Sequence, residues 1–375
     1  MRRLVGLFLL AAAAAFPAQK SRTVSLAELD QLLASDRGKS DRKVAGQIAD
    51  LELSERAGPV KLVQWQAEFT GTHTREALTA LADASAFLAP PAAAISANPP
   101  PDLDTQRTIL SKASDYSAKT LRTLPDFSAS RETVHFEDTP EQLIEQQSPG
   151  TQSFTQRGLR AGNPGPTERF AAAAAMPIHF TGRSSTVVTY RDGYEVPANQ
   201  QGSKMAAAAM GLTSSGEFGP ILSIVLGDAA RGDLRWGYWQ VGTPVAAAVF
   251  RYSVPKEQSH YTVMLPTARQ TVTMSPAYHG EIAIDPETGT VLRIMVISDL
   301  EHPYQWLQID LMVEYAPLEI GERNYVCPVK AIALSKLPLT TAGTDAKHPA
   351  AMQTFLNDVS FTHYHVFRAE SKILQ

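Results

Sequence analysis

The sequence predicts an α+β protein in which an N-terminal helical region precedes a strongly curved, half-barrel-like antiparallel β-sheet. Between residues 23 and 127, apolar residues recur at the spacing of α-helices. Beyond residue 127 the period changes to two, and turn sequences separate the apolar runs. No helix-length segment divides the last six of these runs, which favours antiparallel connections over a parallel sheet.

Four amphipathic helices are expected in the helical region, residues 23–127. The first begins at Ser25-Leu-Ala-Glu28, which has the form of a capping box, and the third ends at Pro90-Pro91. The second and fourth have a single apolar stripe, so we expect the helices to pack against one another as a small bundle. The stripes comprise Leu26, Leu29, Leu33; Val44, Ile48, Leu51; Leu78, Leu81, Ala82, Leu88; and Ile109, Ala113, Tyr116, Leu121, Leu124.

The β domain is expected to occupy residues 128–375. Its clearest hairpin runs from Tyr278 to Ile297 through the turn Pro286-Glu-Thr-Gly289, and another surrounds Arg191-Asp-Gly193. Residues 139–177 are rich in Gln, Ser, Gly and Pro and predict a long loop, apart from a short helix at residues 169–176. Further strands are expected at residues 235–241, 247–254, 261–265, 307–315, 325–334 and 357–368, a short helix at 221–226, and a second loop at 340–350.

Two of these strands indicate what covers the sheet. In residues 309–315, apolar side chains alternate with Asp310 and Glu314, as in a strand that is wet on one side. In residues 291–297, Leu292 is expected to share one face with Ile294 and Val296, while Val291 shares the other with Arg293. Both faces of that strand are largely apolar. We therefore expect part of the sheet to be covered on both sides, by the helices, a loop or an apolar ligand.

The first 18 residues have the form of a secretory signal peptide. Arg2 and Arg3 precede an apolar run that is too short to span a bilayer comfortably, and small residues follow at Ala13, Ala15 and Ala18. We expect the mature protein to be periplasmic or secreted, and not to span a membrane. The formal net charge of the chain is −4, and the signal would remove two arginines and no acid, so nucleic acid is not an expected partner.

Few residues carry recognisable chemistry. Cys327 is the sole cysteine and is expected to be an inert, buried thiol. The segment 211–219 is rich in glycine but lacks the Lys-Ser/Thr ending of a phosphate loop, and we expect no cofactor. His363 and His365 are two apart in a strand, a spacing that can serve a metal, with His302 or His279 as a third ligand. The alternative is a pair of strand histidines without a metal.

An aromatic concentration offers candidate ligand-binding residues. Trp236, Tyr238, Trp239 and Tyr252 lie in two neighbouring strands, and Arg293 lies in the hairpin. Large aromatic side chains are usually part of a core, but they can also line a groove for a lipid, glycan or peptide.

Five segments carry a resemblance: residues 124–127, 215–219, 249–254, 278–294 and 355–374. Together they resemble a group of exported proteins of uncharacterised function from acidobacteria. In many members, a cysteine follows the motif that matches residues 124–127, whereas here Ser128-Ala-Ser130 follows. The hairpin series is also similar, at the level of the fold, to the curved sheets of periplasmic lipoprotein carriers. These resemblances imply export but no catalytic residues.

Three functions remain open from the sequence. The first is a non-enzymatic envelope protein that binds or carries an apolar ligand, such as a lipid or glycan, on a concave face of the sheet. The second is a structural or assembly protein that contacts an envelope protein through its helical region. The third is a metal-dependent hydrolase built on His363 and His365.

Overall fold

The computed structural model describes residues 21–139, 142–145, 170–173, 176–191, 194–196, 216–243, 246–266, 271–320, 323–338 and 352–367. The expected signal peptide, the expected loop at 340–350 and most of the expected loop at 139–177 lie outside these residues.

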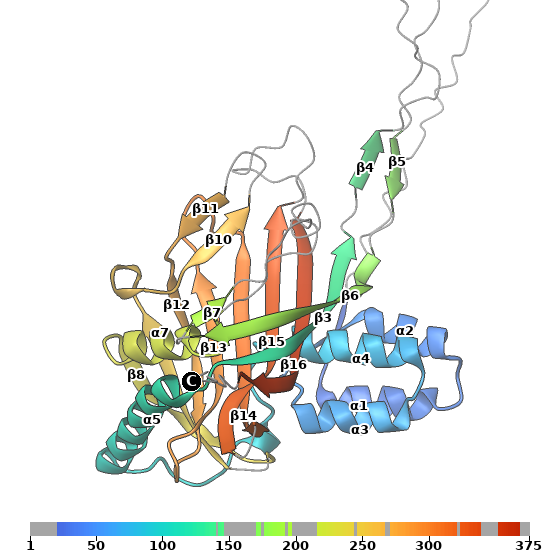
Figure 1. Ribbon diagram of the computed structural model, residues 1–375. Helices are drawn as coiled ribbons and strands as arrows, with labels where there is room; N and C mark the ends of the chain where they lie inside the picture. The colour runs from blue at the N-terminus through green and yellow to red at the C-terminus, as the bar shows by residue number, and fades with distance from the viewer. Residues whose placement is uncertain are drawn as a thin grey trace, which may run out of the picture.

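One antiparallel sheet of ten strands dominates the molecule (Figure 1). The α+β class and the antiparallel sheet are therefore confirmed. In order across the sheet, the strands are β7 (Tyr194–Val196), β6 (Met176–Arg191), β3 (Phe127–Thr139), β16 (Met352–Val366), β15 (Arg323–Pro338), β14 (Gln308–Ile320), β13 (Val291–Asp299), β12 (Ala277–Ile284), β9 (Ala247–Val254) and β8 (Asp233–Gln240). The strands rotate across the sheet, so that β3 and β6 run obliquely to β15 in Figure 1, as strand twist requires.

The predicted hairpin is β12–β13. The side chain of Asp285 holds its turn by accepting hydrogen bonds from the Glu287 backbone N–H (2.9 Å) and the Thr288 hydroxyl (2.7 Å). Gly289 closes the turn with a φ of 76°, which favours glycine. The faces predicted for Val291 and Leu292, at the start of β13, are wrong. The pairing of β12 with β13 shifts at this point, so that Leu292 is an extra residue in β13. A bulge of this kind exchanges the faces of the residues before it.

Four helices form a bundle with its own small core. They are α1 (Leu26–Asp36), α2 (Asp41–Ala49), α3 (Pro59–Glu68) and α4 (Thr72–Ala84), with the short parallel pair β1 (Arg22–Val24) and β2 (Leu51–Leu53) beside them. The capping box at Ser25 is confirmed. Two details differ from expectation: α3 was not predicted, and Leu51 lies in β2 rather than in the second helix.

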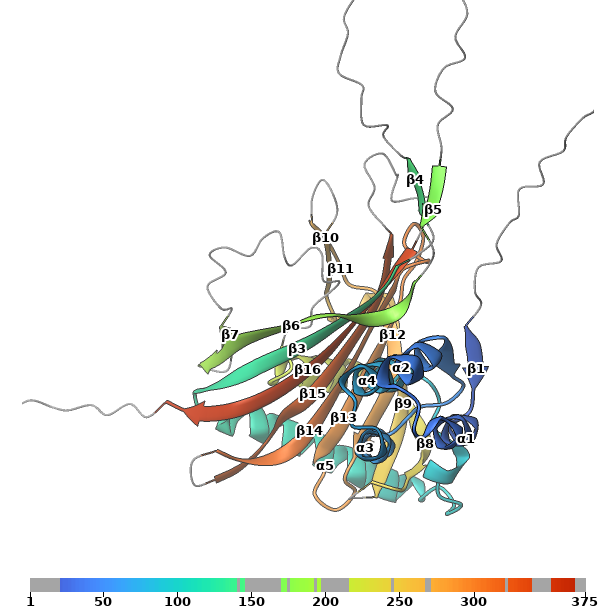
Figure 2. The ribbon, with the colours of Figure 1, turned by 90° about the vertical axis from the view of Figure 1, so that its right-hand side faces the viewer.

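The predicted fourth helix, α5 (Leu103–Thr123), is not part of this bundle. It lies on the opposite face of the sheet, where it shares a core with α7 (Pro220–Ala229), while α4 contacts β6 and β16 from the other side (Figure 2). We call the side covered by α5 and α7 the apolar face; Phe250, Ile282 and Ile294 belong to its core. The side against α1–α4 is the bundle face.

Coverage on both sides corrects the expectation for residues 309–315. Asp310 is buried rather than wet, and its neighbour Met312 packs into the core between the bundle and the sheet. Part of the sheet is thus covered on both faces, as residues 291–297 predicted.

Short elements complete the fold. The prediction of a helix at residues 169–176 is wrong, because Phe170–Ala173 forms the strand β5, which pairs with β4 (Gln142–Glu145). Pairing between strands overrides the helix preference of an alanine run. The remaining elements are the hairpin β10 (Val263–Pro266) and β11 (Thr271–Met274) and the 3₁₀ helices η1 (Ala92–Ala94) and η2 (Lys256–Gln258).

Candidate functional site

The five candidate ligand-binding residues are divided between the two faces of the sheet. Trp236, Trp239 and Tyr252 pack on the apolar face, whereas Tyr238 and Arg293 lie on the bundle face. A bulge at residue 237 causes part of this division, because β8 pairs Trp236 with Phe250 but Tyr238 with Val249. The structure therefore brings three of the candidates together on one side.

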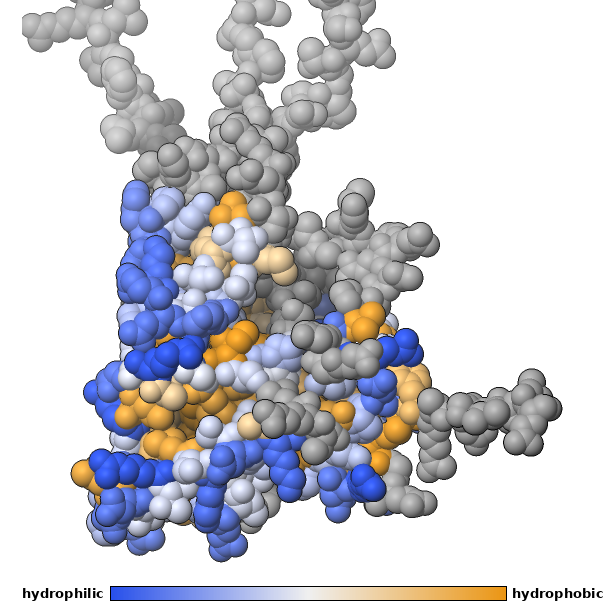
Figure 3. Space-filling view, turned by 60° about the vertical axis from the view of Figure 1, so that its left-hand side comes forward, coloured by the Kyte–Doolittle hydropathy of each residue, from blue (hydrophilic) through white to orange (hydrophobic). Residues whose placement is uncertain are grey.

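The apolar face is hollowed between α7 and α5, near the edge strand β8 (Figure 3). The indoles of Trp236 and Trp239 meet edge to face with their centroids 4.8 Å apart, and Trp236 packs on Phe250 at 5.3 Å. The Trp239 indole N–H donates a hydrogen bond to the Pro99 carbonyl at 3.2 Å, which fixes the ring. Five half-buried apolar side chains of α5, α7 and β8 pack against the core of this face: Leu110, Leu226, Leu234, Trp236 and Trp239.

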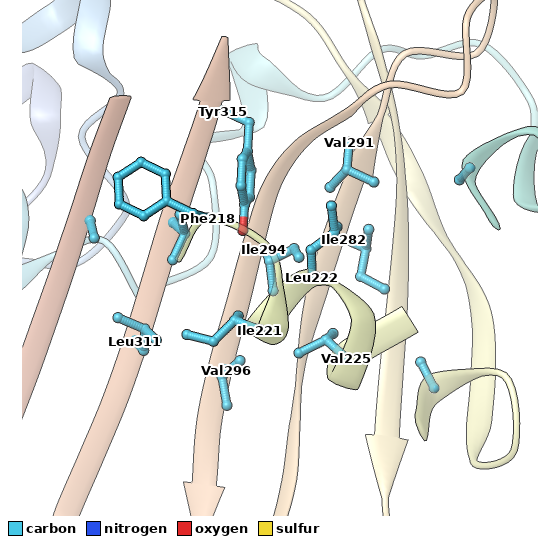
Figure 4. Packing of buried hydrophobic residues seen from close by; sticks show 14 of the residues in the cluster. Phe218, Ile221, Leu222, Val225, Ile282, Val291, Ile294, Val296, Leu311 and Tyr315 are labelled. Atoms are coloured by element: carbon cyan, nitrogen blue, oxygen red, sulfur yellow. The ribbon is translucent and has the colours of Figure 1, made fainter. Parts of the chain in front are cut away.

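The centre of the same face is filled by α7. Figure 4 shows Ile221, Leu222 and Val225 of this helix directed at the sheet, over side chains that include Ile282 and Ile294. All five are buried. The hollow therefore lies beside α7, toward β8, rather than over the middle of the sheet.

Tyr252 belongs to the buried core of the same face. It is buried, and its hydroxyl donates a hydrogen bond to the Met295 carbonyl at 2.6 Å. Burial is the main cause that raises the pKa of this phenol above its ordinary value. Gly280 makes the contact feasible, since a Cβ there would collide with the Met295 carbonyl oxygen. Tyr252 is thus held in the core of the apolar face by a bond that it already makes.

Arg293 belongs to a buried ionic cluster on the bundle face. The centre of the cluster is Glu281, whose Oε2 accepts hydrogen bonds from the Arg56 guanidinium and the Tyr238 hydroxyl, both at 2.9 Å. Arg293 Nη2 lies 3.8 Å from the same oxygen and donates to Gln240 at 2.8 Å. Burial alone would raise the pKa of Glu281, but the charge and hydrogen bond of Arg56 outweigh it and hold that pKa below its usual value.

The two predicted metal ligands lie at a bulge. His363 has a φ of 52°, and the pairing of β16 with β3 shifts between Thr362 and His365. Phe361 is buried while both histidines are exposed. Within the described part of the chain, no group of three or more His, Cys, Asp or Glu side chains is arranged to hold a metal ion. Cys327 is buried as expected, and burial raises the pKa of its thiol to about 12.

Sequence reasoning missed two polar networks. Asp228 of α7 is buried and accepts hydrogen bonds from the His260 ring (2.7 Å), the Tyr278 hydroxyl (2.9 Å) and Arg231 (2.8 Å). Burial would raise the pKa of Asp228, but the hydrogen bonds from His260 and Tyr278 hold it below its usual value. The partners are up to 50 residues away, so spacing gave no signal.

The second network crosses three strands. The ring of His135 in β3 is within hydrogen-bond distance of the Ser184 hydroxyl in β6 (2.9 Å) and of the Asn357 amide oxygen in β16 (2.7 Å). A hydroxyl, an imidazole and an orienting group in this order also occur in acyl-transfer enzymes. The signal available in the sequence was a histidine inside a strand.

Comparison with known proteins gives no relative: no family model, curated protein or solved structure matches this chain. Among the described residues, no helix has both the length and the apolar character needed to cross a bilayer.

Proposed function

We propose that this chain is an exported, non-enzymatic binding protein of the cell envelope that holds an apolar ligand in the hollow between α5 and α7. Two observations carry the proposal: the hollowed apolar surface between α5 and α7 in Figure 3, and the two half-buried tryptophans of β8 that pack against the core of the same face. Water in contact with a concave apolar surface is readily displaced by an acyl chain or a similar group.

The construction of the hollow supports this proposal. The α5 wall is fixed to the β12–β13 turn, because Lys112 donates hydrogen bonds to the carbonyls of Pro286 (3.4 Å) and Glu287 (3.0 Å). In the core of the same face, the Tyr252 hydroxyl is bonded to the Met295 carbonyl, which ties β9 to β13. A preformed site loses little entropy when it binds. We also propose that the sheet is strongly curved and half-barrel-like, because such curvature would deepen the same hollow.

Titration with the fluorescent fatty acid cis-parinaric acid tests the proposal. We expect saturable binding with energy transfer from tryptophan, weakened about tenfold in Trp236→Ala and Trp239→Ala through the loss of apolar contact. Val63→Ala is the matched control, because it removes an exposed apolar side chain from α3 in the bundle. Equal affinity in all variants, or no saturation, would contradict the proposal.

Export is a separate part of the proposal, and it has its own test. The support is the charged and apolar pattern of residues 1–18. N-terminal sequencing of protein from the periplasm of a Gram-negative host should find a chain that begins after Ala15 or Ala18. A chain that keeps Met1 and stays in the cytoplasm would remove this part.

A second candidate is an assembly role of the helical region with an envelope protein. It is favoured by Val60 and Val63, which are one turn apart on α3 and 59% and 66% exposed. If this is the function, Val63→Asp should abolish a specific cross-linked partner in the envelope while leaving parinaric acid binding unchanged.

The enzyme alternatives have direct tests. A serine hydrolase using Ser184 would be labelled at that residue by a fluorophosphonate, and Ser184→Ala would lose the label. A hydrolase using His363 and His365 would retain stoichiometric metal after purification without an affinity tag.

A further inference from the structure

A cleft of about 110 Å³ lies between the helical bundle and the bundle face of the sheet. The residues before and at the start of α3 line one wall, and side chains of β13 and β15 line the other. The charged and amide side chains that line the cleft are those of Arg56, Asp83, Gln240, Arg293, Glu314 and Lys330. This cleft is separate from the apolar hollow, which lies on the opposite face of the sheet.

Arg56 and Arg293 line this cleft, and each keeps one buried hydrogen-bond donor that the fold does not use. Arg56 and Arg293 are only 7% and 8% exposed. Among the described residues, neither Nη1 of Arg56 nor Nε of Arg293 has an acceptor. A buried charged donor without a partner is costly, and proteins generally provide one. The unused donors therefore point to an acceptor that the chain itself does not supply.

The local charge favours an anionic acceptor. Three guanidinium groups lie around Glu281, those of Arg56 at 2.9 Å, Arg251 at 3.5 Å and Arg293 at 3.8 Å. Glu314 is the cross-strand partner of Arg293 and lines the same cleft. These three cations and two carboxylates leave an excess of one positive charge. Lys330 also lines the cleft and is paired with Asp83 at 2.7 Å and with Asp358 at 3.5 Å. Burial raises the pKa of Asp83 to about 8, so near neutral pH the charge of Lys330 is balanced by that of Asp358.

The pKa of Arg293 supports the same conclusion. Burial and the nearby charge of Arg56 lower the pKa of this guanidinium from its ordinary value. Two like charges held together in a poorly hydrated place repel each other. An anion between them would relieve that repulsion.

The start of α3 adds an independent observation. Its N-cap is Gly58, which has no side chain to accept a hydrogen bond from the first turn, and Pro59 follows it. Gly58, Pro59 and Val60 all line the cleft. The N-terminus of a helix carries partial positive charge and is a common site for phosphate and carboxylate groups.

We propose that this cleft binds a small oxyanion, a phosphate or carboxylate group, between Arg56, Arg293 and the N-terminus of α3. Guanidinium groups suit such an anion because they offer paired donors in one plane. The anion would link the bundle to the sheet, since Arg56 precedes α3 and Arg293 lies in β13.

Thermal unfolding tests the site, with inorganic phosphate or acetate exchanged for chloride at constant ionic strength. We expect the Tm of the wild-type chain to rise with the logarithm of phosphate or acetate concentration, as for a ligand that binds the folded state. Arg293→Gln should weaken the apparent affinity about tenfold or more. Arg107→Gln, which changes an exposed arginine of α5, should leave it unchanged.

A second variant and a second ligand complete the experiment. If Arg293→Gln does not fold, Arg293→Lys retains the charge but lacks the planar donors, and it should still bind less tightly. Dihexanoyl phosphatidic acid distinguishes the source: a larger shift than with inorganic phosphate assigns a lipid headgroup, and a smaller shift assigns a free anion. No response of the wild-type chain to phosphate or acetate, or equal responses in the Arg293 variant and the wild type, would overturn the proposal.

Discussion

The two faces of the sheet are built by different means, although they share the same strands. In β12, Ile282 points into the apolar face beneath α7, whereas its neighbour Glu281 points to the bundle face and meets Arg56. The apolar face is stabilised by area removed from water. The bundle face buries charges that are tolerable only while they remain paired. Alternation along one strand thus supplies an apolar core on one face and an ionic cluster on the other.

The largest effect is expected on the bundle face. Glu281→Ala leaves the buried cations of Arg56 and Arg293 without their carboxylate, so it should lower the free energy of unfolding by about 3–5 kcal/mol. Urea denaturation measures this. The control Glu301→Ala breaks an exposed pair with Lys256 and should cost less than about 1 kcal/mol. Equal costs for the two variants would refute a dependence on paired buried charge.

The matching change on the apolar face is Ile282→Ala. The side chain is fully buried, so its truncation should cost about 2–5 kcal/mol through lost transfer energy and a cavity. The same urea measurement applies. Val187→Ala, at a 59% exposed position of β6, should change stability by no more than about 0.5 kcal/mol. A negligible cost at Ile282 would mean that α7 does not pack as described.

Asp228 is a buried charge on the apolar side. The contribution of Asp228 to folding stability should change with pH in the opposite direction to that of Asp310. The pKa of Asp228 is lowered in the fold, so its stabilisation is complete above its unfolded value near 4 and is lost as the pH falls through the lower folded value. Asp228→Asn should cost about 2–4 kcal/mol at neutral pH and remove this acid dependence. If the variant and the wild type lose stability in parallel below about pH 4, the hydrogen bonds of Asp228 are not the cause.

Asp310, on the bundle side, should give the smallest effect. Burial raises its pKa to about 6, so the folded protein holds a proton that the unfolded chain releases near pH 4. Stability should therefore fall as the pH rises between these values. Asp310→Asn should flatten this slope and stabilise the protein by about 1–3 kcal/mol at pH 7.5. A lower stability of the variant at pH 7.5 would contradict the raised pKa.

Local signals predicted the elements whose geometry is set locally. The turn before Gly289 and the capping box at Ser25 depend on neighbouring residues, and both are present. The bulges at Leu292 and near His363 could not be predicted, because an extra residue in one strand is defined against its partner. The first bulge exchanges the faces of Val291 and Leu292. The second interrupts the regular strand between His363 and His365, which were expected to share one face.

The sites depended on contacts between distant residues. The Arg56 and Glu281 pair spans 225 positions, and the helix that begins at Pro59 was missed because its valines are exposed. One signal was available: Glu281 and Arg293 are charged residues within strands that are otherwise apolar. Sequence reasoning named the tryptophans of the hollow, but the position of α5 on that face required the structure.

The most direct test of the proposed apolar site is native mass spectrometry of the protein recovered, without an affinity tag, from the cells in which it naturally occurs. Our account predicts a complex heavier than the polypeptide, from which organic solvent releases an apolar small molecule. The amount released should fall in Trp236→Ala and stay unchanged in Val63→Ala. A mass equal to that of the polypeptide alone, with nothing released, would contradict the account.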